Sequence, residues 1–475
     1  MATTWSDVTQ LLDEARGRSQ LVFGPRTALK TFLKARMMDL EFYDGQYRYR
    51  FPLDLGDAFT AAYGSPGLDG NPVTATAYFY PKKLYGYVEL DGMTAAISEA
   101  AGSLQPGVMD MMVRKVNRCI ASQARAAEIA LWGDGSGRLG LIAKVTDATT
   151  YLRIWLKPVF SMRNTAQTIS DATKYVEKGM YLDFVTYNEA AQAGALVTSA
   201  TGYLVTGVHA GTALYADGSE DSPYIDVTPG TINPGGTPIA AGQWIVLHNS
   251  LDAMPIGFMG FMGGGYSAAA QTMEDDANYP RRGLRTYGTV DTGTAANSPW
   301  SGTVYDIEAG DDTAKTLTEK MMDDWFIQMH RKGDTGDQKM KIQAIIGNPL
   351  TTGVYCRRYT SVRSTLFNQP VPQPNLGFAA PTYTSLHGDG EVPIIGMEDC
   401  PVGMLFACDF GPIKVGAVKA GSGWTEGQGQ RGWTDMLPIK GVKEDTVVKA
   451  YRQYGMYVCR DRRAIGAMMN ININP

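Results

Sequence analysis

The stretch PGVMDMMVRKVNRCIASQARAAEIALWGDGSG, residues 106–137, decides the fold prediction. Pro106 suits the first turn of a helix and Gly133 suits the position just after its end. Between them, apolar residues recur at helical spacing and form one stripe. We therefore predict one helix over residues 106–132, roughly 40 Å long at 1.5 Å per residue. The stripe consists of Met109, Val113, Val116, Ile120, Ala124, Ala127 and Leu131.

The glycines that follow this helix match a nucleotide-binding pattern, but their context is wrong for it. Gly135 to Gly140 fits GxGxxG, which binds a pyrophosphate only where it follows a strand and opens a helix. Here it follows the end of the predicted helix, so we predict a helix-terminating turn. No GxxxxGK[ST] phosphate loop occurs.

Before the helix, the sequence predicts a long extended arm. Residues 47–60 and 73–90 are rich in aromatic and β-branched residues and flank GSPGLDGNP, residues 64–72, a dense run of turn formers. This pattern indicates a hairpin or looped-out arm within 45–95. A two-stranded ribbon is marginally stable alone in water, so the arm needs a neighbour. The predicted inter-subunit contacts at its tip are Ser65, Pro66, Gly67, Leu68, Asp69 and Gly70.

After the helix, strand patterns alternate with turn residues. Residues 176–255 read as short strands between glycines and prolines, which indicates an inserted small β-barrel or sandwich. Residues 311–445 mix helix and strand, with Thr316 and Glu319 as a capping box for a helix. Residues 446–473 predict long strands interrupted by a polar break at Arg460–Arg463.

Composition excludes several functional classes. The formal net charge is −5 over 475 residues, which argues against a protein that grips nucleic acid over its whole surface. No secretory signal and no apolar run long enough for a membrane span are visible. The five cysteines lack CxxC spacing and the four histidines lack HExxH or HxH spacing. We therefore predict no disulfide framework, no metal site, no cofactor and no catalytic site.

Two basic clusters and two tryptophans are candidate contact residues. Arg357, Arg358 and Arg363 interleave with tyrosines as in single-strand binders, whereas Arg460, Arg462 and Arg463 form a positive patch diluted by one aspartate. Either cluster can equally be a solvated or ion-paired surface. Trp424 and Trp433 lie within and just after a glycine-rich stretch, 421–432, that we expect to project as a loop. They are either interface anchors or residues packed beneath their own loop.

The order of these elements resembles the major capsid proteins of tailed bacteriophages. The resemblance rests on an extended loop ending at Lys82–Gly86, the long "spine" helix, and an aromatic-Gly-Asp-Gly turn at Trp132–Gly135. Segments 256–260, 298–300 and 398–403 are similar as well. Each motif is short, and the likeness lies in their order over most of the chain.

The resemblance implies an α+β fold: the tailed-phage major capsid protein fold with an inserted β-barrel or sandwich domain. It divides the chain into an N-terminal arm (1–44), an extended loop (45–95), a peripheral domain with the spine helix (96–175), the inserted domain (176–255), the peripheral domain continued (256–310), an axial domain (311–445) and C-terminal strands returning to the peripheral domain (446–475).

The resemblance also implies a function. Hexamers and pentamers of the chain would form an icosahedral shell that encloses double-stranded DNA, with loose DNA contact on its inner face and no membrane. The subunit would be part of the virion and assemble in the bacterial cytoplasm. A separate scaffolding protein, a portal and decoration proteins are the expected partners. Because Lys82 and Lys83 stand at the base of the loop and not at its tip, the crosslink that some relatives form is not expected.

Two other functions remain open at this stage. An encapsulin-like nanocompartment shares the fold, although such chains generally lack a large inserted β domain. A secreted carbohydrate-active β/α enzyme would need a signal peptide and a convergent pair of carboxylates, and neither is evident in the sequence.

Overall fold

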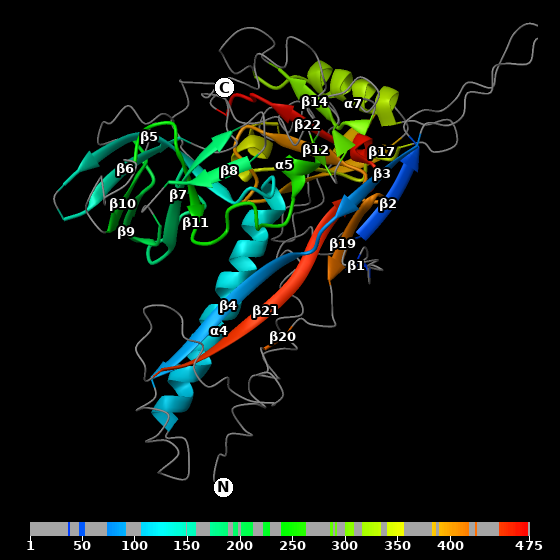
Figure 1. The fold of residues 1–475 in the computed structure, drawn as a ribbon. Helices are drawn as coiled ribbons and strands as arrows, with labels where there is room; N and C mark the ends of the chain where they lie inside the picture. The colour runs from blue at the N-terminus through cyan, green and yellow to red at the C-terminus, as the bar shows by residue number, and fades with distance from the viewer. Residues whose placement is uncertain are drawn as a thin grey trace, which may run out of the picture. The chain divides into compact units, whose positions relative to one another are not determined.

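The computed structural model confirms the α+β class. It describes residues 37–38, 47–52, 74–91, 106–148, 150–157, 172–188, 193–197, 201–211, 222–228, 239–262, 286–287, 290–291, 300–307, 316–333, 340–355, 382–385, 389–417, 423–424 and 446–473. The chain forms two units (Figure 1). The first comprises Met1–Tyr47, Tyr80–Leu131 and Lys414–Val458, and the second Arg48–Phe79, Trp132–Ile413 and Cys459–Pro475.

The first unit contains the predicted spine helix. Helix α4 runs over Pro106–Trp132, the bounds that the sequence predicted. Ala127 and Leu131 of the predicted stripe are buried, whereas Arg114 and Arg118 are exposed. The amphipathic pattern therefore orients the helix as expected wherever its side chains are described.

A long, narrow β-ribbon forms the rest of the first unit. Strand β4 (Lys82–Asp91) pairs antiparallel with β21 (Thr446–Cys459) through ten consecutive register pairs, from Lys82↔Gly455 to Asp91↔Thr446. Ten residues at about 3.3 Å each give a ribbon roughly 33 Å long. Strand β21 also pairs with β19 (Ile413–Ala417) and, at two positions, with β20 (Gly423–Trp424), while β1 (Met37–Met38) runs parallel to β19, so the ribbon is part of a five-stranded sheet.

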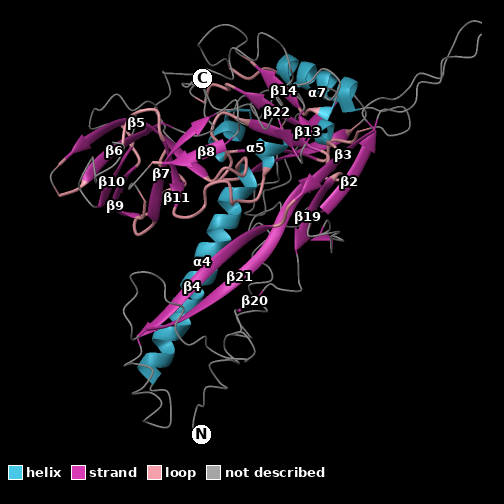
Figure 2. Cartoon of the chain, viewed as in Figure 1, coloured by secondary structure: helices cyan, strands magenta, loops and turns pink. Residues whose placement is uncertain are grey.

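A mixed six-stranded sheet forms the main core of the second unit (Figure 2). Its order is β14 (Thr303–Asp306), β22 (Ile465–Met469), β18 (Leu405–Cys408), β15 (Ala344–Gly347), β17 (Gly390–Gly396) and β16 (Thr382–Ser385). Helix α7 (Glu319–Gly333) contributes Trp325, Phe326 and Met329 to the same apolar cluster as Ile345 and Ile394 of the sheet. This burial is the principal stabilising contribution in the unit.

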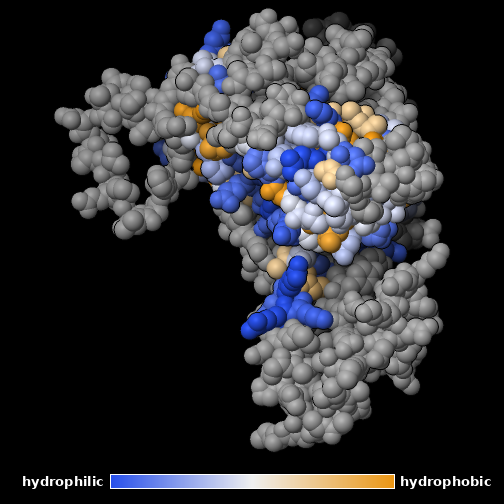
Figure 3. All heavy atoms as spheres, turned by 90° about the vertical axis from the view of Figure 1, so that its left-hand side faces the viewer, coloured by the Kyte–Doolittle hydropathy of each residue, from blue (hydrophilic) through white to orange (hydrophobic). Residues whose placement is uncertain are grey.

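The same unit carries a closed antiparallel barrel. Its strands are β5 (Arg138–Asp147), β6 (Leu152–Lys157), β7 (Tyr181–Asn188), β9 (Tyr203–His209), β10 (Tyr224–Thr228) and β11 (Trp244–Leu247), with β8 (Ala193–Leu196) added at the edge of β7. The barrel closes because β11 pairs with both β5 and β7. Leu152, Ile154 and Leu156 point inward and are fully buried. On the face shown in Figure 3, the described atoms are mostly hydrophilic or intermediate, with scattered hydrophobic spots.

Short elements complete the second unit. The base of the predicted extended loop is a two-stranded ribbon of β2 (Tyr47–Pro52, whose first residue belongs to the first unit) and β3 (Thr74–Phe79). Strands β12 (Thr286–Tyr287) and β13 (Val290–Asp291) form a second small pair. Helix α5 (Phe258–Phe261) and the 3₁₀ turn η2 (Arg462–Ala464) are single turns.

The structure corrects two predicted domain boundaries. The barrel does not begin at residue 176, because β5 and β6 at 138–157 are two of its strands. Strands β14 and β22, assigned to the peripheral domain, share one sheet with the strands of the predicted axial domain. Both errors arose because sequence pattern identifies strands but not their partners, which are set by tertiary packing.

Two local predictions also change. The α7 cap is Thr318, whose hydroxyl accepts a hydrogen bond from the Met321 amide at 3.3 Å, and not Thr316. The stretch 421–432 is not all projecting loop, since Gly423 and Trp424 pair with β21.

The turn after α4 is a helix-terminating turn, as the sequence predicted, and it forms a buried polar clamp. Asp134 accepts hydrogen bonds from the Ser136 amide at 3.0 Å and from the Arg138 guanidinium at 2.7 Å. That guanidinium also lies over the rings of Tyr187 and Trp244, at 4.2 and 4.4 Å. Gly137 has φ +80°, and a Cβ there would lie 2.5 Å from the Ser250 carbonyl oxygen, so only glycine fits.

The clamp gives the first testable prediction. In Asp134→Ala the Arg138 charge stays buried without its carboxylate, so we expect the free energy of unfolding to fall by about 3–5 kcal/mol. The double variant Asp134→Ala/Arg138→Met removes both charges and is expected to recover part of the loss. Urea denaturation of the three proteins measures this. Equal stability of the single and double variants would contradict the importance of the buried charge.

Barrel closure gives the second prediction. A fragment covering 133–255 contains every strand of the barrel, so we expect it to melt cooperatively by circular dichroism. A fragment covering 176–255 lacks β5 and β6 and leaves β10 and β11 each with one unpaired edge, so no cooperative transition is expected. A cooperative melt of the shorter fragment would show that closure is dispensable.

Candidate functional site at the basic turn

The structure describes only some of the predicted contact residues. Trp424 lies in β20, while Arg460, Arg462 and Arg463 lie where β21 ends and β22 begins. The remaining candidates fall outside the described residues. They are Ser65, Pro66, Gly67, Leu68, Asp69, Gly70, Arg357, Arg358, Arg363 and Trp433.

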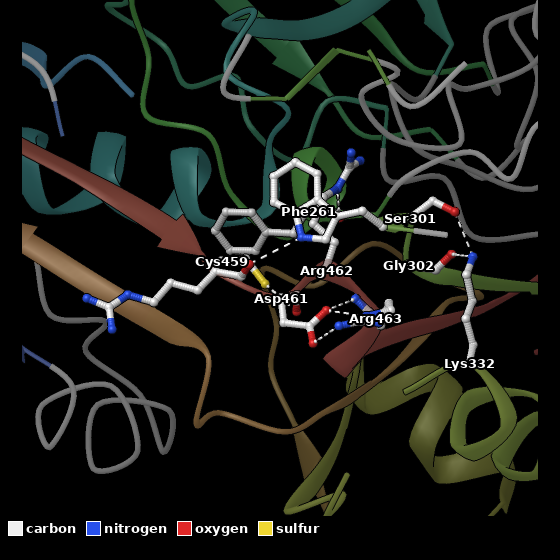
Figure 4. Close-up of polar contacts among 10 residues, drawn as sticks. Phe261, Ser301, Gly302, Lys332, Cys459, Asp461, Arg462 and Arg463 are labelled. Atoms are coloured by element: carbon white, nitrogen blue, oxygen red, sulfur yellow. Dashed lines mark hydrogen bonds and ion pairs between the residues drawn. The ribbon is translucent and has the colours of Figure 1, made fainter. Parts of the chain in front are cut away.

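Arg462 is an interior anchor, which corrects its assignment to a surface patch. It has no exposed surface. Its Nε donates to the Phe261 carbonyl at 2.7 Å (Figure 4), and a terminal nitrogen donates to the Gly260 carbonyl at 3.4 Å. These carbonyls end helix α5, where a positive charge is favourable. Burial lowers the pKa of Arg462 to about 10, so the group stays charged at neutral pH.

Two aromatic rings enclose this guanidinium. Its carbon lies 4.9 Å from the ring centre of Tyr287 and 5.8 Å from that of Trp300, within the range of cation–π attraction. Both rings also hold the backbone of the turn. The Tyr287 hydroxyl accepts from the Cys459 amide at 2.8 Å, and the Trp300 indole donates to the Arg460 carbonyl at 3.2 Å. Side chains distant in sequence therefore fix the chain at this turn.

The other two arginines have local partners. Arg463 makes a two-pronged ion pair with Asp461, at 2.8 and 2.9 Å, and Asp461 also caps the 3₁₀ turn by accepting from the Arg463 amide. The Arg460 guanidinium lies 5.3 Å from the ring centre of Tyr49 in β2. The ion-paired alternative therefore describes Arg463, and the three arginines do not form one solvated patch.

The basic turn supports the base of the extended loop. Tyr49 of β2 contacts Arg460, and Phe79 of β3 packs edge-on against Tyr287 at 4.8 Å. Phe79 and Ala77 are buried. Both strands of the arm therefore rest on residues that touch the basic turn. The sequence identified the turn but gave no signal for Tyr287, which joins it to the arm across more than 170 residues.

Lys332 of α7 is a partly buried lysine near the same turn. Its ammonium donates to the Ser301 hydroxyl at 2.6 Å and to the Gly302 carbonyl at 3.1 Å (Figure 4). Desolvation, followed by the positive charges of Arg462 and Arg463, lowers its pKa to about 8. The sequence reasoning missed this residue because helical periodicity alone gives no sign that a lysine is partly buried.

Two kinds of functional site can be tested among the polar groups of the described residues, a metal site and a nucleophilic triad. Among them, no group of three or more His, Cys, Asp or Glu side chains is placed to hold a metal ion. Ser385, Asp389 and His330 lie together, but the serine hydroxyl and the imidazole both bind Asp389, at 2.9 and 2.8 Å. A nucleophilic triad instead needs the histidine between the serine and the aspartate. This cluster therefore has the connectivity of a structural network.

No described helix has the length and apolar character that crossing a bilayer requires.

Comparisons with known proteins find capsid structures. No family model matches the chain, and no curated protein matches it. A chain of the cyanophage A-1(L) capsid asymmetric unit matches at 11% identity and TM-score 0.44, covering 93% of this chain and 92% of that one. A chain of the satellite phage P4 procapsid matches at 9% identity and TM-score 0.36, covering 97% and 90%. An encapsulin complex from Synechococcus elongatus matches at 10% identity and TM-score 0.23, covering 36% and 54%.

These matches belong to the class of structures that the sequence resemblance named. Each of their TM-scores lies below 0.5, so the functional inference rests on the geometry of the chain itself.

Lys332 gives the third prediction. Because its folded pKa is about 8 and its unfolded value is 10.5, the unfolded chain binds more protons between these pH values. The free energy of unfolding therefore rises with pH across that window, by up to ~3 kcal/mol. Below pH 8 both states are protonated, and the charged, partly buried lysine lowers stability.

Lys332→Met removes this cost. We expect the free energy of unfolding to rise by about 1–3 kcal/mol at pH 7 and to lose its slope between pH 8 and 10. Chemical denaturation at several pH values measures both effects. Lys341→Met, at an exposed lysine, is the control and should keep the wild-type slope. A wild-type slope in Lys332→Met would contradict the assignment.

Proposed function

We propose that this chain is the major capsid subunit of a tailed bacteriophage, which self-assembles into hexamers and pentamers of an icosahedral shell around double-stranded DNA. The observation that supports this most is the narrow ribbon in which β4 pairs with β21 at ten positions, whereas the other described strands of that sheet, β1, β19 and β20, have two to five residues each. Two-stranded ribbons bury too little to be stable alone. Such a ribbon is best explained by neighbours that cover it.

The extended arm supports the same proposal. Strands β2 and β3 are joined by 21 residues, 53–73, that include the predicted contact tip. The structure describes a firmly anchored base for this arm, through Phe79, Tyr287 and the basic turn. A rigid base holds a long arm in a defined direction, which lets it reach a second subunit. Contacts of this kind are modest singly and strong when every subunit makes them at once.

In this proposed function the subunit has partners other than copies of itself. A separate scaffolding protein, a portal and decoration proteins complete the particle, which assembles in the bacterial cytoplasm and becomes the virion head. The role is structural, with no reaction at the polar clusters described above.

Size and content of the purified particle test this proposal. We expect expression of the full chain, alone or with a scaffolding protein, to give capsomers or megadalton particles on a sizing column and shells in electron micrographs. A stable monomer at 51.5 kDa under both conditions would contradict it. Shells that enclose a specific enzyme in the native host, and no DNA, would instead identify a nanocompartment.

Deletion of residues 65–72 is the fourth prediction. We expect a chain with wild-type circular dichroism and an unchanged melt, because the deletion removes only the tip of the arm. Closed shells should fail to form, since the arm no longer reaches its neighbour. Electron microscopy measures assembly.

A deletion of equal length within the barrel is the matched control. Removing residues 213–220 shortens the connection between β9 and β10 and should leave assembly unchanged. Normal shells from the 65–72 deletion would show that the arm is not an assembly contact.

A further inference from the structure

One face of α4 concentrates positive charge. Arg114, Lys115 and Arg118 are exposed, together with Asn117 and Ser122. These five residues, called here the α4 basic face, lie within about 160° of the helical wheel at 100° per residue. Nothing in the proposed arm-and-ribbon assembly uses this face.

The charges around Arg118 are unfavourable for an isolated helix, whereas Arg114 has a carboxylate, Asp110, four residues before it. Arg118 has Arg114 four residues before it and Lys115 three residues before it, while Ala121 and Ser122 occupy the corresponding positions after it. Like charges at these spacings destabilise a helix by about 0.2–0.5 kcal/mol per pair. No carboxylate neighbours Arg118 at i±3 or i±4, and the described residues provide no ion pair for Arg114 or Arg118. An external anion would relieve this repulsion.

The residue types favour a phosphate backbone over a protein. Arginine, lysine, asparagine and serine are the side chains that contact phosphate and sugar oxygens. Protein interfaces instead centre on buried aromatic or large apolar anchors, and the described exposed residues between 114 and 122 include none, only Ala121. The face also lacks exposed rings for stacking the bases of a single strand.

We propose that the α4 basic face binds the phosphate backbone of double-stranded DNA without regard to sequence. This inference rests on the proposed function, in which a shell encloses a DNA duplex, and it names the surface that contacts that duplex. The contact is weak, because Arg114 and Arg118 neutralise about two phosphates and the logarithm of the affinity then falls with the logarithm of salt concentration with a slope of about −1.8. Weak contact is compatible with later release of the DNA.

The salt dependence of DNA binding tests this assignment. Unassembled full-length chain from the sizing column is titrated against a fluorescein-labelled duplex of about 30 base pairs, by anisotropy, over a series of KCl concentrations. Arg114→Ala/Arg118→Ala should reduce the magnitude of the slope by about 1.8, at about 0.9 for each lost contact. Alanine favours helix, so circular dichroism should show α4 intact.

Two further double variants make the result specific. Arg114→Lys/Arg118→Lys keeps both charges and should keep the wild-type slope. Arg331→Ala/Lys341→Ala removes two exposed cations of the second unit and should also leave the slope unchanged. An unchanged slope in Arg114→Ala/Arg118→Ala, or an equal loss in Arg331→Ala/Lys341→Ala, would overturn the proposal.

Competing polymers separate the alternatives. If Arg114→Ala/Arg118→Ala weakens binding to polyglutamate but not to the duplex, the face binds an acidic protein segment and the DNA proposal is wrong. A larger loss for a labelled oligo-dT strand than for the duplex overturns it in favour of single strands. Micrographs of the same preparations distinguish the DNA-binding proposal from the capsid proposal. If shells form and Arg114→Ala/Arg118→Ala leaves the salt slope of DNA binding unchanged, only the DNA-binding inference is refuted. A slope change from a chain that never assembles refutes only the capsid function.

Discussion

The buried charge of Arg462 is the constraint on which the second unit depends. A guanidinium removed from water is costly unless hydrogen bonds and charge partners replace its hydration. Here the carbonyls that end α5 and the faces of Tyr287 and Trp300 do so. The groups that meet these requirements come from α5, β12 and the segment before β14, and all three elements contact the same turn. Phe79, at the base of the predicted extended arm, packs on the same ring of Tyr287, so the residues that satisfy this charge also hold that base.

The two units use different sources of stability. The six-stranded sheet and α7 bury a continuous apolar cluster, and the barrel removes nearly all its edges by closing on itself. The first unit is a ribbon and a long helix. Residues near the end of β21 are buried. Burial raises the pKa of Tyr457, and the nearby Glu128 carboxylate of α4 raises it further. A helix and ribbon of this length have much surface for their volume, and assembly would cover it.

Two polar clusters in this chain show how hydrogen-bond connectivity indicates a structural role for residue types that also occur in active sites. The Asp134–Arg138 clamp and the Asp389 cluster combine residue types that also occur in active sites. Each is closed on itself: the Asp134 carboxylate binds its own turn, and Asp389 binds Ser385, His330 and the Ile342 amide at 3.0 Å. Groups already paired with buried protein partners hold elements in place.

The sequence by itself determined the local elements. Periodicity and end signals located α4 at residues 106–132, and alternation placed barrel strands between 176 and 255 and the break at Arg460–Arg463, because these patterns depend on neighbours a few residues apart. Tertiary structure alone decided which strands pair, so that β5 and β6 joined the barrel and β14 and β22 joined the sheet of the predicted axial domain. It also decided that Arg462 is fully buried and that Lys332 is partly buried. Strand pairing and the burial of a charge are set by residues distant in the chain, such as Tyr287 and Trp300, and no local pattern records them.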